Sequence, residues 1–218
     1  MNHIIFFVKY PEKGKVKTRL AKSIGDEHAL GLYKCMVEDI LAMLKDTGID
    51  FTIFYSPDDK ENELKEWLGD NKFVAQQGKD LGEKMKNAFT FVFKDDEIKN
   101  AIIIGSDSPD IPEKLIFEAF DPLEKNEAVI GPSFDGGYYL LGFTKQSFIP
   151  EVFNGIDWST EKVFEQTMKI LLDHNKKVSL LQRWADIDTI DELKEFAEKN
   201  KNKESLTMQY IKDNKLLN

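Results

Sequence analysis

The chain has 218 residues, 41% of them apolar and 16 of them phenylalanine, which suits one large α/β domain and excludes a disordered chain. A net charge of −9, with both signs spread along the sequence, excludes broad binding to nucleic acid, and a single cysteine, Cys35, excludes an intrachain disulfide. The sequence shows no signal peptide and no apolar run near the about 20 residues that span a bilayer, so we expect a cytoplasmic protein, with its oligomeric state unknown.

The first predicted strand, Ile4–Val8, runs into a basic loop at residues 9–20. Its cationic side chains are Lys9, Lys13, Lys15, Lys17 and Arg19. A donor-rich loop directly after the first strand of an α/β domain is typical of a phosphate-binding site. The Lys17-Thr18 pair is only a partial echo of a Walker A loop, and the dinucleotide glycine pattern is absent. The alternative is a solvated basic loop.

Helical spacing predicts a helix at residues 26–45, followed by a strand at 50–55, a helix at 59–68 and a short strand at 73–75. The loop at 76–83 is rich in turn residues and amides, among them Gln77, Gly78 and Gly82. Two glycines at the carboxyl end of a strand suggest backbone close to a ligand, although an ordinary loop has the same appearance.

The central stretch is the wholly apolar run 101–104, which continues into Gly105, Ser106 and Asp107. A β-branched run of this kind predicts a strand buried on both faces of a parallel sheet. Asp107 then lies at the carboxyl edge, where open α/β sheets hold ligands. In the alternative, Asp107 and Asp110 serve as turn residues or as N-caps of the helix that begins near Glu113.

Two further strands, 128–131 and 138–143, flank Asp135-Gly136-Gly137. The segment reads as a hairpin turn, or as bare backbone against which a bound group presses. Ser159 or Thr160 is expected to cap a helix over 161–172. A late strand at 178–181 and a helix capped by Thr189 follow. Residues 200–218 are polar and predict a surface helix or a frayed tail.

Six segments in this order resemble one protein family. They are Tyr10–Leu20, Gly78–Met85, Gly105–Asp110, Gly131–Tyr139, Trp158–Thr160 and Asp186–Thr189. The sequence is similar to an uncharacterised bacterial glycosyltransferase-like family (DUF2064 type) of the nucleotide-diphospho-sugar transferase superfamily, which is related to molybdenum-cofactor and phospholactate guanylyltransferases. The resemblance covers about residues 4–199. It implies a single three-layer α/β/α sandwich with a mostly parallel sheet over residues 1–199, leaving 200–218 outside, and Mg²⁺ or Mn²⁺ at the carboxyl edge of the sheet.

The resemblance also implies roles for individual residues. Asp107 and Asp188 are the expected metal ligands, and Lys17 and Arg19 the expected cations on the donor phosphates. Further donor contacts are expected from Lys9, Lys15, Thr18, Gln77, Gly78, Gly82 and Ser106. The acceptor side is expected at Gly136, Gly137, Tyr138, Trp158 and Ser159, with Asp135 orienting or deprotonating a hydroxyl. Asp107, Asp135 and Lys17 form the expected catalytic set. Two departures are the missing Asp-x-Asp at Asp107 and Ile190 in place of a common proline.

We therefore expect a metal-dependent transferase with a nucleotide-activated donor and a small-molecule acceptor. A diphosphate in an acidic protein needs local neutralisation, which two carboxylates with a divalent ion and a basic loop supply. Such chemistry needs no protein nucleophile, in keeping with the lack of a Ser-His-Asp or Cys-His set. Glycosyl transfer from a nucleotide sugar is the first expectation, and nucleotidyl transfer from a triphosphate to a phosphorylated acceptor the alternative. A nucleotide-binding module without turnover is a further alternative.

Overall fold

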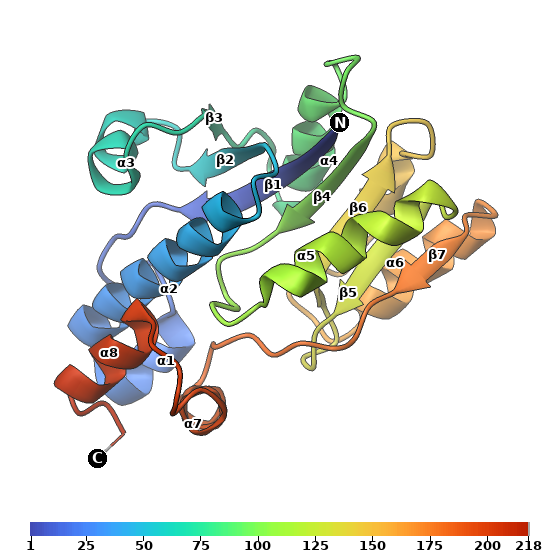
Figure 1. Cartoon of the computed structure of the whole chain (residues 1–218). Helices are drawn as coiled ribbons and strands as arrows, with labels where there is room; N and C mark the ends of the chain where they lie inside the picture. The colour runs from blue at the N-terminus through green and yellow to red at the C-terminus, as the bar shows by residue number, and fades with distance from the viewer. Residues whose placement is uncertain (218) are drawn as a thin grey trace.

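The computed structural model describes residues 1–217, which form a seven-stranded sheet with helices on both faces (Figure 1). The strands are β1 (Asn2–Lys9), β2 (Phe51–Ser56), β3 (Phe73–Ala75), β4 (Asn100–Ile104), β5 (Ala128–Pro132), β6 (Tyr138–Thr144) and β7 (Val178–Leu180). The helices are α1 (Thr18–Ile24), α2 (Asp26–Asp46), α3 (Glu61–Leu68), α4 (Leu81–Val92), α5 (Glu113–Phe120), α6 (Val163–Asp173), α7 (Ile190–Lys199) and α8 (Leu206–Asp213), with short 3₁₀ turns η1 (Asp121–Glu124) and η2 (Pro150–Phe153).

The sheet has the strand order β3-β2-β1-β4-β6-β5-β7. All neighbouring pairs are parallel except those of β6, which is antiparallel to both β4 and β5. The apolar runs predicted as buried strands are β1 and β4, and Ile4 and Ile102 at their centre are fully buried and paired with each other. The predicted three-layer sandwich with a mostly parallel sheet is confirmed.

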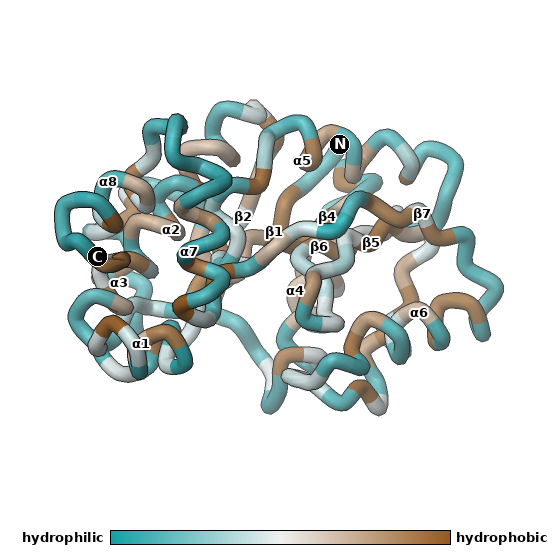
Figure 2. The backbone as a smooth tube through the Cα atoms, turned by 90° about the horizontal axis from the view of Figure 1, so that it is seen from below, coloured by the Kyte–Doolittle hydropathy of each residue, from teal (hydrophilic) through white to brown (hydrophobic). Residues whose placement is uncertain are grey.

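Two apolar layers hold helices against the sheet. One face is covered by α2, α3 and α5, and the other by α4 and α6 (Figures 1 and 2). Phe89 of α4 anchors the second layer, because its ring packs on Phe143 of β6, with 5.3 Å between ring centroids. Each helix turns an apolar face toward the sheet and a polar face toward solvent. The helices therefore cover both faces of the sheet and leave the ends of its strands accessible.

The C-terminal segment packs on the rest of the domain. Met208 and Ile211 of α8 are buried in a small apolar cluster with residues of α1, α2 and α7. The first turn of α8 donates the backbone N–H groups of Leu206 and Thr207 to the Asp39 carboxylate of α2, both at 2.9 Å. Of the two expectations for residues 200–218, the helix is the one observed. Of the helices within residues 1–217, none combines the length and the apolar character that a bilayer crossing requires.

Local capping differs from expectation at two places. Helix α6 begins at Val163, and Thr160 donates its hydroxyl to the Asp157 carbonyl instead of capping, so the predicted cap at Ser159 or Thr160 is wrong. Ser159 adopts a left-handed φ of 65°, which ends the preceding turn before a helix can start. At Thr189 the capping prediction is confirmed, because Thr189 and Glu192 form a complete capping box.

A buried histidine makes the stability of the fold depend on pH. His3 of β1 is 6% exposed, and its Nε2 lies 3.0 Å from the Thr52 hydroxyl of β2. Burial, helped by the charge of Lys72, lowers the pKa of His3 from 6.5 to about 4. The folded state therefore excludes a proton that the unfolded chain binds below pH 6.5.

We expect the free energy of unfolding to fall by about 2 kcal/mol through this group between pH 7.5 and pH 5, and the dependence to level off below pH 4. Urea unfolding of the wild type and of His3→Gln at both pH values measures the effect. His174→Gln is the control, because His174 lies exposed on the last turn of α6. An equal pH dependence in wild type and His3→Gln would contradict the prediction.

Candidate active site

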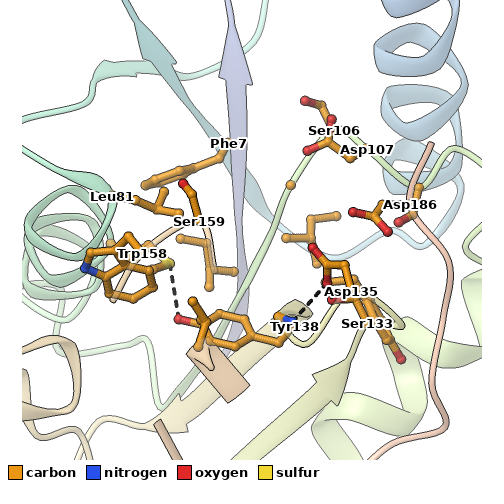
Figure 3. Close-up of a pocket in the computed structure, with 18 of the residues that line it drawn as sticks. Phe7, Leu81, Ser106, Asp107, Ser133, Asp135, Tyr138, Trp158, Ser159 and Asp186 are labelled. Carbon is orange, nitrogen blue, oxygen red and sulfur yellow. Dashed lines mark hydrogen bonds between the residues drawn. The ribbon is translucent and has the colours of Figure 1, made fainter. Parts of the chain in front are cut away.

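The carboxyl ends of six strands meet at one edge of the sheet, because β6 alone runs in the opposite direction. At this edge lies a cleft of about 950 Å³. Its walls come from the ends of β1 and β4, the start of α4, the turn between β5 and β6, the 158–163 segment and the 186–188 segment. Figure 3 shows side chains from these separate stretches of the chain facing a common space.

A buried lysine joins the two predicted metal ligands. The Lys17 ammonium donates to Asp107 Oδ1 and, at 2.9 Å, to Asp188 Oδ1. The Lys17 side chain is only 2% exposed, whereas that of Asp107 is 51% exposed toward the cleft. Arg19 forms a second ion pair with Asp188 through its other carboxylate oxygen. Residues 17, 107 and 188 therefore form one ionic cluster beneath the cleft.

The backbone explains how these distant residues meet. The Ile187 N–H donates to the Asp107 carbonyl at 2.9 Å, which fixes the 186–188 segment against the end of β4. Glu192 then accepts the backbone N–H groups of Asp188 (2.8 Å) and Thr189 (2.7 Å). Lys17 has left-handed dihedrals, with φ 46° and ψ 43°, and this turns its side chain inward as α1 begins. The Ile187 hydrogen bond, the Glu192 carboxylate and the backbone conformation of Lys17 thus together hold the ionic cluster in place.

Charge governs the ionisation of the cluster. Burial alone would lower the pKa of Lys17, but Asp107 and Asp188 outweigh it and the pKa is raised. Burial likewise opposes ionisation of Asp188, and Lys17 followed by Arg19 overcomes it, so the pKa of Asp188 is lowered. Lys17 and Asp188 are therefore charged at neutral pH.

A second pair of carboxylates, Asp135 and Asp186, lines the same side of the cleft (Figure 3). Asp135 sits in the β5–β6 turn, where its Oδ1 accepts the Ser133 hydroxyl and, at 2.9 Å, the Gly137 N–H. Burial, followed by the charge of Asp135, raises the pKa of Asp186 to about 6. The predicted hairpin is confirmed, and the same turn that forms it aims Asp135 toward Asp186 (Figure 3).

An apolar wall faces these carboxylates. Trp158 packs on Gly82 at the start of α4 so closely that a Cβ at Gly82 would lie 2.6 Å from the indole. The Tyr138 hydroxyl contacts the Met85 sulfur at 3.8 Å, and Phe7 and Leu81 complete the wall (Figure 3). Trp158 belongs to the core layer beneath α4 and also lines the cleft, and its acceptor-binding role stays a prediction.

The cleft collects most of the predicted site residues. Those that line it are Lys9, Arg19, Ser106, Asp107, Asp135, Gly137, Tyr138, Trp158, Ser159 and Asp188. Those outside its lining are Lys15, Lys17, Thr18, Gln77, Gly78, Gly82 and Gly136. Gly136 has a left-handed φ of 90°, and the space beside it is taken by the backbone of Glu161 rather than by an open surface. The functional roles of all these residues stay predictions.

Neither aspartate after β4 caps α5, whose N-cap position is Pro112. Asp110 is instead structural: it accepts the Trp184 indole N–H (2.8 Å) and the Asn200 amide (3.0 Å), and pairs with Lys199 (2.9 Å). Sequence reasoning missed Asp186, Gln76, Lys84 and Glu161 as lining residues. Of these four residues, only Asp186 could have been identified from the sequence, because it stands two positions before Asp188 in the motif 186–189.

The carboxylates of the ionic cluster supply part of the ligand set that a hard divalent ion requires. Asp107 and Asp188 already hold one cationic group, the Lys17 ammonium, between them. Within residues 1–217 there is no cluster of three or more metal-ligating side chains. Mg²⁺ often binds proteins through one or two carboxylates and takes its other ligands from phosphates and water. The two carboxylates fit that pattern, provided that the ammonium gives way.

Residues 40–160, more than half of the chain, match the protein family described as "Uncharacterized protein conserved in bacteria (DUF2064)". The chain belongs to this family. The predicted resemblance is therefore confirmed.

Three known proteins are similar to this chain in sequence or in fold. A crystal structure from Desulfovibrio desulfuricans G20, provisionally assigned as a nucleotide-diphospho-sugar transferase, is 42% identical with a TM-score of 0.94, covering 98% of this chain and 95% of the other. The 2-phospho-L-lactate guanylyltransferase of Methanocaldococcus infernus is 30% identical over 145 residues, 66% of this chain and 62% of that enzyme. The chain thus spans about three fifths of this curated relative. Rv0371c from Mycobacterium tuberculosis, crystallised with manganese, shares the fold at 13% identity (TM-score 0.56, covering 90% of this chain and 97% of that one).

Proposed function

We propose that this protein is a transferase that uses a nucleotide-activated donor, and that the donor is a nucleotide-diphospho-sugar. The observation that carries the proposal is the composition of the cleft. Cationic groups and the paired carboxylates Asp107 and Asp188 line one part of the cleft, and in another part an aromatic wall faces the further carboxylates Asp135 and Asp186. The first part suits a diphosphate and the second a sugar ring with its hydroxyl groups.

The donor phosphates would lie near Lys9 and Arg19, at the ends of β1 and the start of α1. Asp107 and Asp188 would hold Mg²⁺ or Mn²⁺, and the ion would neutralise phosphate charge and stabilise the departing diphosphate. Lys17, which pairs with both carboxylates, would add a further positive charge beside them.

The reaction itself needs a positioned acceptor and a base. The acceptor oxygen attacks the anomeric carbon, the bond from that carbon to the diphosphate oxygen breaks, and the nucleoside diphosphate leaves with the bonding electrons. The acceptor's hydroxyl proton goes to Asp135. That carboxylate suits the role because both donors of its own turn use Oδ1, so Oδ2 remains for a ligand.

Nucleotidyl transfer is the second candidate, because the curated relative is a guanylyltransferase. The same cations and metal would then stabilise pyrophosphate leaving the α-phosphorus of a triphosphate. The two reactions differ in the bond that breaks and therefore in their products.

Product analysis separates them. The purified full chain is incubated with Mn²⁺ and a panel of nucleotide sugars and nucleoside triphosphates, and slow background hydrolysis is followed by ³¹P NMR. We expect nucleoside diphosphate from a nucleotide sugar, and no product when the metal is chelated. Pyrophosphate from a triphosphate, with every nucleotide sugar intact, would reject glycosyl transfer in favour of nucleotidyl transfer.

A further inference from the structure

The cations that line the cleft come from one half of the chain, whereas its carboxylates come from both halves, with Asp80 and Asp107 in the N-terminal half. Every cation that lines it within residues 1–217 comes from the N-terminal half, namely Lys9 of β1, Arg19 of α1 and Lys84 of α4. The lining residues between 133 and 188 include no Lys, Arg or His. They do include four carboxylates, those of Asp135, Glu161, Asp186 and Asp188.

Of these four carboxylates, only Asp188 has a cationic partner among the described residues. Lys17 and Arg19 neutralise Asp188 from below. Asp135 accepts neutral donors from its own turn, and the ion pairs of residues 1–217 include neither Asp186 nor Glu161. The wall made by residues 133–163 and 186 therefore carries uncompensated negative charge into a partly enclosed space, where its field is screened less than on an open surface.

The shape of this half adds a second constraint. Trp158 and Tyr138 present aromatic surface on one side, and Asp135 faces them across the cleft (Figure 3). Ser133 and Ser159 also line the same space with their hydroxyl groups. A wall with one apolar face and one row of hydrogen-bond acceptors matches a compact molecule whose faces are C–H groups and whose edge carries hydroxyl donors.

We propose that the acceptor is an uncharged, polyhydroxylated compound, and that the carboxylates of this wall exclude phosphorylated and carboxylated acceptors. The proposal rests on the proposed transferase function, since it assigns the acceptor half of that cleft. An acceptor phosphate placed there would meet like charges without a cation from the same wall, which is unfavourable at close range. The same charges accept hydrogen bonds from hydroxyl groups and favour a neutral acceptor.

The consequence is a difference in selectivity from the guanylyltransferase relative, whose name specifies a phosphorylated acid as acceptor. The proposed preference for neutral acceptors arises from repulsion of charged ones. Changing the charge of one wall residue from negative to positive should therefore remove much of that preference. Glu161 suits the change because it is exposed at the rim and does not pair with another residue of the described chain. Glu165, on the first turn of α6 and outside the cleft lining, offers the same charge change as a matched control.

The test uses two matched pairs of probes, glucose with glucose 6-phosphate and glycerol with glycerol 3-phosphate. Saturation-transfer NMR on the full chain measures each probe at millimolar concentration, first without nucleotide and then with Mn²⁺ and a saturating nucleoside diphosphate. In the wild type we expect each neutral probe to bind more tightly than its phosphorylated partner, by about tenfold or more. In Glu161→Lys this ratio should shrink toward one, and in Glu165→Lys it should stay as in the wild type.

Two results would overturn the proposal. One is a phosphorylated probe that binds the wild type as tightly as its neutral partner, and the other is failure of both neutral probes to bind in either condition. Failure of the donor assignment has a different signature: the nucleoside diphosphate does not bind, while the preference among the probes persists without it. The acceptor proposal and the proposed function can therefore fail separately.

Discussion

Replacing both Asp107 and Asp188 by Asn should lower the free energy of unfolding by about 3–5 kcal/mol, because it leaves the buried Lys17 ammonium without a counter-charge. The Lys17 side chain is 2% exposed and has no other carboxylate within ion-pair distance in residues 1–217. Either single substitution leaves one partner in place and should cost less. Chemical denaturation of the single and double variants measures these differences.

A third substitution tests the cause. Adding Lys17→Met to the double variant removes the unpaired charge and keeps an apolar side chain of similar length, so most of the lost stability should return. Asp96→Asn is the control, because Asp96 pairs with Lys145 while 98% exposed, and such exposed pairs contribute little to stability. A double variant as stable as the wild type would show that the cluster does not hold Lys17 in this state.

The second large effect concerns donor binding. Asp107→Asn alone should weaken metal-dependent binding of a nucleoside diphosphate by at least about a hundredfold, because Asn keeps the shape of the ligand and loses the charge that a divalent ion needs. Asp107 is half-exposed and still leaves Lys17 paired with Asp188, so the fold should persist. Isothermal titration with Mn²⁺ and with chelator separates the metal-dependent part of the affinity.

The chelated titration is the internal control, since wild type and variant should then bind the nucleotide equally. Asp96→Asn should match the wild type in both conditions. Unchanged Mn²⁺-dependent affinity in Asp107→Asn would remove this residue from the metal site. The carboxylate pair would then be a purely structural partner of Lys17.

Strands and layers followed from local patterns in the sequence. A run such as 101–104 is apolar on both faces, and only a central strand covered by helices on either side buries such a run. The position of Asp107 at the carboxyl edge follows from the same run, since the residue after a strand has little freedom. Local pattern and tertiary environment agree there.

The rest of the site depends on contacts that sequence alone does not encode locally. The inward position of Lys17 depends on a left-handed backbone conformation and on two carboxylates, those of residues 107 and 188. The surroundings of Gly136 depend on the backbone of Glu161, which occupies the space beside it. Segments distant in sequence set both arrangements, and no period or propensity of the local stretch predicts them.

The reversed direction of β6 has a consequence for how this family could diversify. Under the proposed function, the acceptor half of the cleft is formed by the β5–β6 turn and the 158–163 segment, which a hydrogen bond from the Phe164 N–H to the Gly136 carbonyl at 2.9 Å ties to that turn. The basic loop on the proposed phosphate side follows β1, which pairs with β2 and β4 and not with β6. Members of one family could therefore vary the turn at 133–137 and accept different substrates while the basic loop keeps its place.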